Sequence, residues 1–198
     1  MALGLTFRET MTGWFALGET DPRSGSKRGK HEGIQLSISP IVTINDLDEF
    51  ICNEHHIGTL CTEVHFPLLF PGPVTSEDGR FNLFVRIGNT RRKMMLYELS
   101  FEFGGKNYYL TGHKEIENDP GFDLLKDTTT LFTILHEGSD KRGPVIGAGI
   151  LRITFPEFVK QLLSMRIIGA KSFREKLQAL AVFLQFFLVE LSETYWTR

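Results

Sequence analysis

Apolar and polar residues alternate with a period of two over most of residues 3–153, which is the pattern of β-strands with one buried face. The first run places Leu5, Phe7, Met11 and Phe15 on one face. In the run around residues 97–103, Tyr97, Leu99, Phe101 and Phe103 alternate with polar side chains. The other runs lie at 34–44, 60–66, 81–87, 108–116, 129–136 and 145–153. The pattern therefore predicts eight strands.

Some of the connections between these strands are short. The segment "FGGKN" places two glycines between the fifth and sixth runs, which indicates a tight hairpin turn. Short turns favour an antiparallel meander. An eight-stranded meander closes into a barrel, which removes its edges and can enclose one small ligand, or folds over as a sandwich. We expect a mainly β fold, with the barrel favoured over the sandwich, in one domain spanning residues 1–198.

Three segments have helical character instead. We expect residues 45–53 to form a short helix capped by Asn45 or Asp46. Residues 155–168 follow Thr154 and Glu157, which have capping-box spacing. We expect this second helix to end at Gly169.

Residues 172–196 give the longest helical pattern. Their apolar centre, "ALAVFLQFFLV", has 11 residues, whereas a bilayer span needs about 20, so no transmembrane segment is predicted. We expect the helix to pack against the sheet or over a barrel mouth, with a membrane-surface or partner-binding helix as the alternative.

Composition narrows the function classes. Phe is in excess, at 17 of 198 residues, which predicts either an aromatic core or an apolar cavity. The net charge of -2 argues against nucleic acid as a partner. We expect the basic clusters at 23–30 and 91–93 to lie in solvated turns. Two cysteines and no signal-peptide pattern predict a cytoplasmic protein, with peripheral membrane attachment as the alternative.

Carboxylates are concentrated in residues 113–138. "DPG" predicts a type II turn at Pro120 and Gly121, which makes this segment a connection between strands. Asp119, Asp123 and their neighbours are then turn and capping residues, with paired acid/base carboxylates as the alternative. The spacing does not match a calcium-binding loop.

Two strand faces carry candidate chemistry. Glu9 lies on the apolar face of the first strand, where a carboxylate is costly unless paired, so it marks a cavity or a place where the strand bends outward. His113 shares a face with Tyr109, Thr111 and Glu115, which faces either a wet lumen or solvent.

A third face raises the question of a metal. Cys61, Glu63 and His65 alternate along one strand and are a weak candidate for zinc. A solvated polar face is the favoured interpretation, so no metal is predicted. The sequence contains no GxSxG elbow and no complete dinucleotide fingerprint, and we predict no cofactor.

Five segments together carry a family resemblance: "LTFRETMTGWFALGETD", "DGRFNLFV", "YYLTGHKEIENDPGFDLLKDTTTLFTILHEG", "GAGILRI" and "FVKQLLSMRIIGAKS". In this order they resemble the non-flavin region of bacterial proteins that combine a cholesterol-oxidase-like glucose-methanol-choline (GMC) oxidoreductase with an α/β-hydrolase. The chain has neither the flavin fingerprint nor the hydrolase elbow, so the resemblance carries over no activity. It implies an accessory module that accompanies enzymes acting on sterol-like or other lipid substrates.

The leading hypothesis is a non-catalytic module that binds an apolar small molecule, such as a lipid or sterol-like compound. Its alternatives are an interaction domain that docks a partner enzyme through the last helix, and a small barrel isomerase or cyclase using Glu9 or His113. The candidate ligand-binding residues are Glu9, Trp14, His113, Asp119, Phe122 and Asp123.

Overall fold

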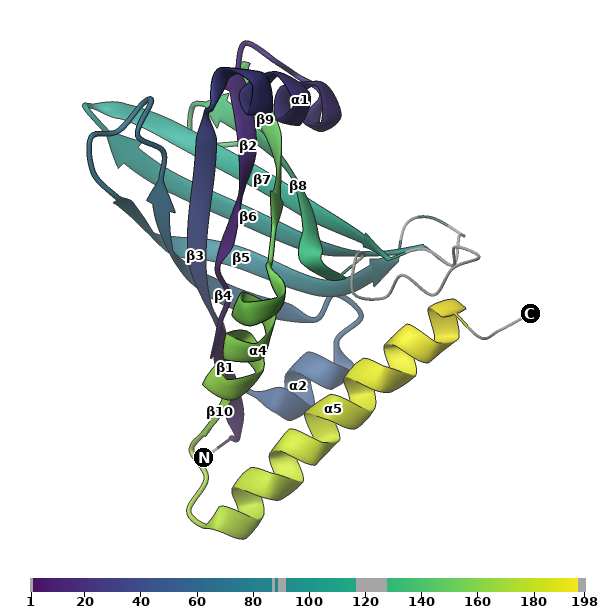
Figure 1. The fold of residues 1–198 in the computed structure, drawn as a ribbon. Coiled ribbons are helices and arrows are strands. Elements are labelled where there is room, and N and C mark those ends of the chain that lie inside the picture. Colours follow the sequence, from purple (N-terminus) through teal and green to yellow (C-terminus); the bar gives the residue numbers. More distant parts are fainter. Residues whose placement is uncertain (1, 87, 89–91, 117–127, 196–198) are drawn as a thin grey trace.

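The computed structural model describes residues 2–86, 88, 92–116 and 128–195, with side chains as far as Ser192. Antiparallel strands form a barrel that closes because β3 pairs with β2 on one side and with β4 on the other (Figure 1). The strands are β1 (Gly4–Arg8), β2 (Met11–Leu17), β3 (Gln35–Ile44), β4 (Ile57–His65), β5 (Val74–Arg86), β6 (Lys93–Phe103), β7 (Lys106–Ile116), β8 (Thr130–Glu137), β9 (Val145–Arg152) and β10 (Arg166–Ile168). The helices are α1 (Pro22–Glu32), α2 (Leu47–Cys52), α4 (Phe155–Ser164) and α5 (Phe173–Tyr195).

The predicted mainly β fold with an eight-stranded antiparallel barrel is confirmed. Strands β2 to β9 form the closed barrel, each of them pairing with its neighbours in the order β3-β2-β9-β8-β7-β6-β5-β4. Gly104 and Gly105, the predicted hairpin turn, both have positive φ, at 61° and 74°, which is the backbone that a type I′ turn requires. We call the end of the barrel with this turn the hairpin end, and the end with α2, α4 and α5 the helix end.

β1 and β2 are two parts of one long strand along β3. Their register against β3 is continuous, since Phe7 pairs with Val42 and Met11 with Ile38. Between them the Glu9 backbone N–H donates to the Pro40 carbonyl at 2.9 Å, and proline has no N–H to return the bond. On the other side β2 pairs with β9, whereas β1 pairs with β10. Glu9 therefore lies where one neighbouring strand has ended and the other begins.

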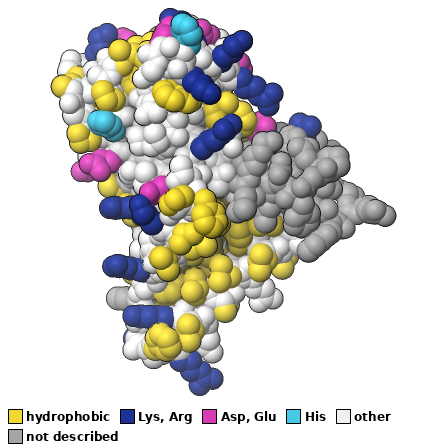
Figure 2. Space-filling model, viewed as in Figure 1, with side chains coloured by type: hydrophobic (Ala, Val, Ile, Leu, Met, Phe, Trp, Pro, Cys, Tyr) yellow, Lys and Arg dark blue, Asp and Glu magenta, His cyan; other side chains and the backbone are white. Residues whose placement is uncertain are grey.

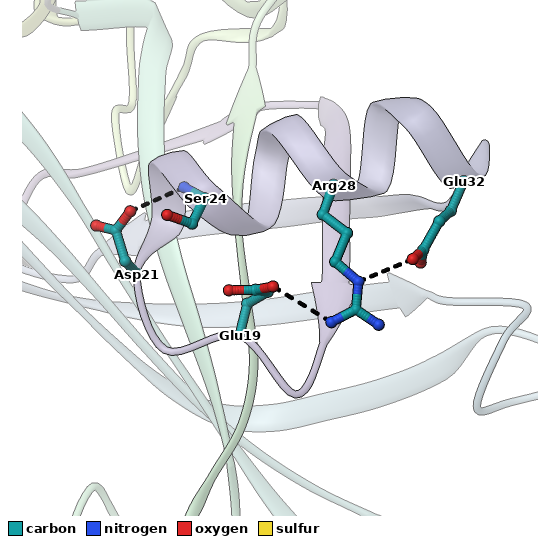
Figure 3. A network of polar contacts seen from close by, with 5 residues as sticks. All are labelled: Glu19, Asp21, Ser24, Arg28 and Glu32. Carbon is teal, nitrogen blue, oxygen red and sulfur yellow. Dashed lines mark hydrogen bonds and ion pairs between the residues drawn. The ribbon is translucent and has the colours of Figure 1, made fainter.

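The basic cluster at 23–30 was predicted to lie in a solvated turn. This is wrong, because these residues belong to helix α1. Asp21 caps it by accepting from the Ser24 backbone N–H at 2.8 Å, and Arg28 pairs with Glu19 and Glu32 (Figure 3). The helix was missed because its buried face carries no large apolar side chain: Gly25 and Gly29 face the barrel. A Cβ on Gly29 would lie 2.4 Å from the carbonyl oxygen of Phe15. The glycines thus let the helix backbone lie directly on β2 and β9.

Three smaller predictions concern helix ends. Asp46 caps α2 by accepting from the Glu49 backbone N–H at 3.0 Å, as expected. Thr154 is the N-cap of α4, but its side chain makes no capping hydrogen bond. The helix predicted over 155–168 is too long, because α4 ends at Ser164 and residues 166–168 form β10. As a strand, these three residues pair with the edge of β1. They could not make these hydrogen bonds if α4 continued through them.

The interior differs between the two ends of the barrel. At the hairpin end aromatic rings pack against one another: Phe70 makes edge contacts with Phe66, Phe101, Phe103 and Tyr108 at centroid distances of 5.0–6.4 Å. At the helix end α5 covers the barrel mouth (Figure 1). The Phe excess therefore builds a core in one half, and in the other it lines a cavity described below.

Helix α5 is held over the mouth by aromatic rings and by an ion pair with the buried Lys93. Phe186 contacts Phe50 and His56, and Phe187 contacts Phe84 at 5.1 Å. Phe84 has a positive φ of 55° at a β-bulge in β5, and both it and the preceding residue are buried. The ammonium of Lys93, which is buried, lies 2.8 Å from the Glu190 carboxylate on α5. Within the described residues no helix is long and apolar enough to cross a bilayer.

Candidate functional site

A largely apolar cavity of about 130 Å³ lies at the helix end, between the barrel interior and helices α4 and α5. Its barrel wall comes from β1, β5, β6 and β7, and its outer wall from the two helices. It is lined by Phe7, Glu9, Phe81, Leu83, Met95, Lys114, Thr128, Phe158, Gln161, Leu162, Met165, Phe183, Leu184, Phe187 and Leu191.

A polar cluster centred on Glu9 lies inside this apolar wall. The Glu9 carboxylate accepts from the Tyr97 hydroxyl at 2.9 Å and from the Lys114 ammonium at 3.3 Å, both at Oε2. Its other oxygen, Oε1, accepts from the Gln161 amide at 2.6 Å. Glu9 is 3% exposed, so its predicted position on the apolar face is confirmed and its charge is paired. We call Glu9, Tyr97, Lys114 and Gln161 the Glu9 cluster.

Burial and the Glu9 carboxylate act on the two other ionisable members of the cluster. Burial lowers the pKa of the Lys114 ammonium, because a buried cation is poorly solvated, and the adjacent carboxylate opposes this. Burial raises the pKa of the Tyr97 hydroxyl well above its usual range, and the negative charge of Glu9 adds to the rise. Tyr97 is thus a neutral hydrogen-bond donor at neutral pH.

Two groups of the cluster have hydrogen-bonding capacity left over. The Gln161 Oε1 atom is buried and has no hydrogen-bond partner among the described residues. Its amide cannot be reversed to correct this, since the Glu9 carboxylate only accepts and so fixes the NH₂ group towards itself. Lys114 has three N–H donors, and Glu9 is its one acceptor in the described part of the chain. Among the described residues, the cavity therefore contains an acceptor and donors that make no hydrogen bond.

Trp14 and His113 lie outside this cavity. Trp14 is half-buried on β2 and is not a lining residue. His113 lies on the side of β7 opposite Lys114, where it stacks on Phe132 at 5.3 Å and its Nε2 is 3.4 Å from Glu115. The face of β7 that carries His113 was predicted to line a wet lumen or to face solvent. The lumen is wrong, because the alternate residues of β7, such as Leu110 and Ile116, point into the barrel.

The other candidates fall into two groups. Asp119, Phe122 and Asp123, with the predicted turn at Pro120, lie outside the described residues and stay predictions. Cys61, Glu63 and His65 project from one side of β4, as expected, and all three are exposed. In the described ranges no group of three or more His, Cys, Asp or Glu side chains is arranged to hold a metal ion.

Sequence reasoning missed three members of the Glu9 cluster. Lys114 had a usable signal: it has the same phase along β7 as the buried Leu110 and Ile116. Tyr97 was placed on the apolar face of its strand, but its hydroxyl was given no partner. Gln161 had no signal, because its contact with Glu9 spans 152 positions of the chain.

A second depression, of about 560 Å³, lies beside the loop between α2 and β4, and His55, His56 and Arg86 are among its lining residues. It is larger, but its lining is more polar. The smaller cavity encloses paired buried charges and unused hydrogen-bonding groups, which is the more specific arrangement.

Comparison with protein-family models, with curated proteins and with solved structures gives no match to this chain.

Proposed function

We propose that this protein binds an apolar small molecule carrying a hydroxyl group in the cavity at the helix end of the barrel. The observation that supports this most directly is the pair of unused hydrogen-bonding groups inside an apolar wall: the acceptor Gln161 Oε1 and the donors of Lys114. Buried polar atoms without hydrogen-bond partners are rare in folded proteins. A bound ligand that supplies a partner for each of these two groups would explain why their hydrogen-bonding capacity is unused among the described residues.

The chemistry of the two groups selects the polar part of the ligand. A hydroxyl donates one hydrogen bond and accepts two, so it can donate to Gln161 and accept from Lys114 together. Both of these residues contact the Glu9 carboxylate, Lys114 at Oε2 and Gln161 at Oε1, and this shared contact supports the proposal that one small polar group reaches both. A carboxylate ligand has no proton for Gln161 and would face the negative charge of Glu9. A ketone accepts from Lys114 but leaves Gln161 unpaired.

The volume of the cavity limits the apolar part of the ligand. Apolar cavities of about 150 Å³ hold one benzene-sized ring, so about 130 Å³ takes one ring or a short branched chain. A whole sterol-like molecule needs more space, since ligand sites of that class measure about 300–1,000 Å³. Leu162 and Leu184 line the cavity and are exposed as well, at 46% and 39%, so a longer ligand would leave between α4 and α5.

The resemblance to the accessory region of GMC oxidoreductase and hydrolase fusions agrees with this ligand class. Sterols and lipid alcohols join an apolar body to a hydroxyl group. We propose that the natural ligand is such a lipid and that the protein accompanies an enzyme that acts on it.

The first experiment is native mass spectrometry of the purified protein, followed by solvent extraction and identification of any released compound. The second is titration with cyclohexanol and methylcyclohexane, which differ by a hydroxyl in place of a methyl group. Cyclohexanol is expected to bind at least tenfold more tightly, a difference of about 1.4 kcal/mol. In Gln161→Met the preference is expected to shrink while methylcyclohexane still binds.

Equal binding of the two compounds by the wild-type protein would refute the role of the polar groups. Binding of neither, together with an empty protein after extraction, would refute the cavity as a ligand site. Trp14→Phe is the matched control, because Trp14 does not line the cavity, and it is expected to bind both compounds as the wild type does.

Proton transfer by the Glu9 cluster is a second candidate function. The observation that favours it is that a carboxylate and an ammonium line one apolar cavity and a buried phenol donates to the same carboxylate, an environment typical of acid/base sites. An isomerase or cyclase of this kind predicts that Glu9→Gln keeps ligand binding and abolishes turnover. Unchanged turnover in that variant would exclude Glu9 as the acid or base.

A further inference from the structure

The outer surface of α4 and α5 carries a large set of exposed apolar side chains. On α4 they include Leu163, which is 81% exposed, and on α5 Phe173, which is 75% exposed. Figure 2 shows hydrophobic side chains gathered over this part of the molecule. We call the surface the helical apolar patch; it consists of Phe155, Val159, Leu162, Leu163, Leu184 and Leu188, with Phe173 and Leu177 at its far end.

These residues follow the helical repeat. Phe155, Val159 and Leu162 are spaced for one side of α4, and Phe173, Leu177, Leu184 and Leu188 for one side of α5. The two stripes meet at the cavity, since Leu162 and Leu184 both line it. Contiguous apolar surfaces of this kind mark interaction sites.

The charge around the patch identifies its partner. Residues 155–178 contain five basic and two acidic residues, a net charge of +3 in a chain whose total is -2. The basic residues Lys160, Arg166, Lys171, Arg174 and Lys176 are all exposed. The two acidic residues, Glu157 and Glu175, have partners within the segment, in the Lys160 ammonium and the Lys171 backbone N–H. Figure 2 shows Lys and Arg side chains along the edge of the apolar area.

We propose that the helical apolar patch docks on the surface of a membrane rich in anionic lipids. Exposed apolar side chains flanked by Lys and Arg are the composition of segments that lie in the lipid interface, where the apolar groups enter the acyl region and the cations meet lipid phosphates. A second copy of the chain is a poorer partner. A two-fold dimer would place the same +3 segment against itself, and the like charges would repel.

Docking in this orientation brings the cavity to the lipid. Because Leu162 and Leu184 belong both to the patch and to the cavity wall, the exit between α4 and α5 would face the acyl chains. A lipid alcohol would then pass from the bilayer to the Glu9 cluster without crossing water. This consequence rests on the proposed ligand function, whereas the docking itself does not.

The test is flotation of the purified protein with vesicles of phosphatidylcholine alone and with 30% phosphatidylserine added. Docking predicts binding at least tenfold tighter to the anionic vesicles, weakened by high salt because salt screens exposed charges. The variant Leu163→Ser/Phe173→Ser removes the two most exposed apolar side chains of the patch and is expected to abolish flotation. Its matched control is Leu68→Ser, which removes a side chain 52% exposed outside the patch.

A second pair of variants separates local charge from net charge. Arg166→Glu/Arg174→Glu reverses two charges beside the patch, and Lys27→Glu/Lys30→Glu reverses two exposed charges on α1, at the opposite end of the barrel (Figure 1). The first variant is expected to lose at least tenfold in affinity for anionic vesicles and the second to lose less than threefold. Circular dichroism of all variants checks that they fold as the wild type does.

Three results would overturn docking on a membrane: no flotation of the wild type with either vesicle, equal losses in the two charge variants, or sedimentation as a dimer that Leu163→Ser/Phe173→Ser makes monomeric. The last would assign the patch to a second copy. The cyclohexanol titration is done without vesicles, so the two proposals fail independently.

Discussion

The buried pair of Glu9 and Lys114 gives the sharpest test of the structure, through a double-mutant cycle of Glu9→Gln and Lys114→Met. The side chains are 4% and 1% exposed and their charged atoms lie 3.3 Å apart. At an effective dielectric constant of about 20 this distance corresponds to an attraction of about 5 kcal/mol. Removing one partner of a buried pair typically costs about 3–5 kcal/mol, because the other charge is left unpaired.

Glu9→Gln is expected to lower the free energy of unfolding by about 3–5 kcal/mol at pH 7. This loss has an upper limit, because Lys114 in the folded variant can release its proton and become neutral. That release costs about 1.4 kcal/mol per pH unit below the usual lysine pKa of 10.5, which is about 5 kcal/mol at pH 7. The double variant replaces both charges by neutral groups, so its loss is expected to be at least 3 kcal/mol smaller than the sum of the single losses.

The pH dependence follows from the direction of the Lys114 shift. Burial lowers the pKa of Lys114, and in Glu9→Gln no carboxylate opposes this. The unfolded chain then binds a proton that the folded chain lacks, so the free energy of unfolding of this variant rises with pH. The loss relative to the wild type should therefore be smaller at pH 9 than at pH 7.

Urea unfolding followed by circular dichroism measures all four proteins of the cycle, with equal m-values as the check on two-state behaviour. The control cycle uses Lys106→Met and Glu137→Gln, whose charged atoms are 3.2 Å apart but whose side chains are 59% and 44% exposed. Exposed pairs contribute about 0–1 kcal/mol, so the control coupling should be small. Additive losses at Glu9 and Lys114, or a Glu9→Gln loss independent of pH, would refute the buried ion pair.

Three further predictions concern other parts of the fold. Tyr97 has a raised pKa, so above pH 10 the unfolded chain loses a proton that the folded chain keeps, and the free energy of unfolding falls. Tyr97→Phe should lower the free energy of unfolding by about 1.5–3 kcal/mol at pH 7, and urea titrations should show a smaller fall of its stability above pH 10. Gly29→Ala should lower the melting temperature by several degrees, because its Cβ would lie 2.4 Å from the Phe15 carbonyl oxygen, whereas Lys27→Ala on the exposed side of α1 should change it little. Lys93→Met removes the ion pair with Glu190 and should speed hydrogen exchange in residues 183–191 of α5 while leaving β2 protected; unchanged exchange in α5 would show that this ion pair does not hold the helix.

The sequence by itself determined the barrel strands. Any fold that buries one face of each strand gives the sequence a period of two. The alternation therefore predicts that residues such as Leu99 and Leu110 point inward, even when the neighbouring strands are not known. The Gly-Gly turn and the cap at Asp46 are local in the same way, because their hydrogen bonds join residues a few positions apart. The position of Glu9 on an apolar face was also visible, and it indicated a cavity or an outward bend of the strand.

Tertiary structure decided how the charge of Glu9 is satisfied. Its partners Tyr97, Lys114 and Gln161 are 88, 105 and 152 positions away, and no local pattern specifies which distant strand or helix closes over a given side chain. The same reason explains α1 and β10. A helix that packs through Gly25 and Gly29 has no apolar stripe to detect, and three residues become a strand only because the edge of β1 is free to pair with them. Local periodicity thus determined which way side chains point, whereas contacts between distant segments determined what they meet.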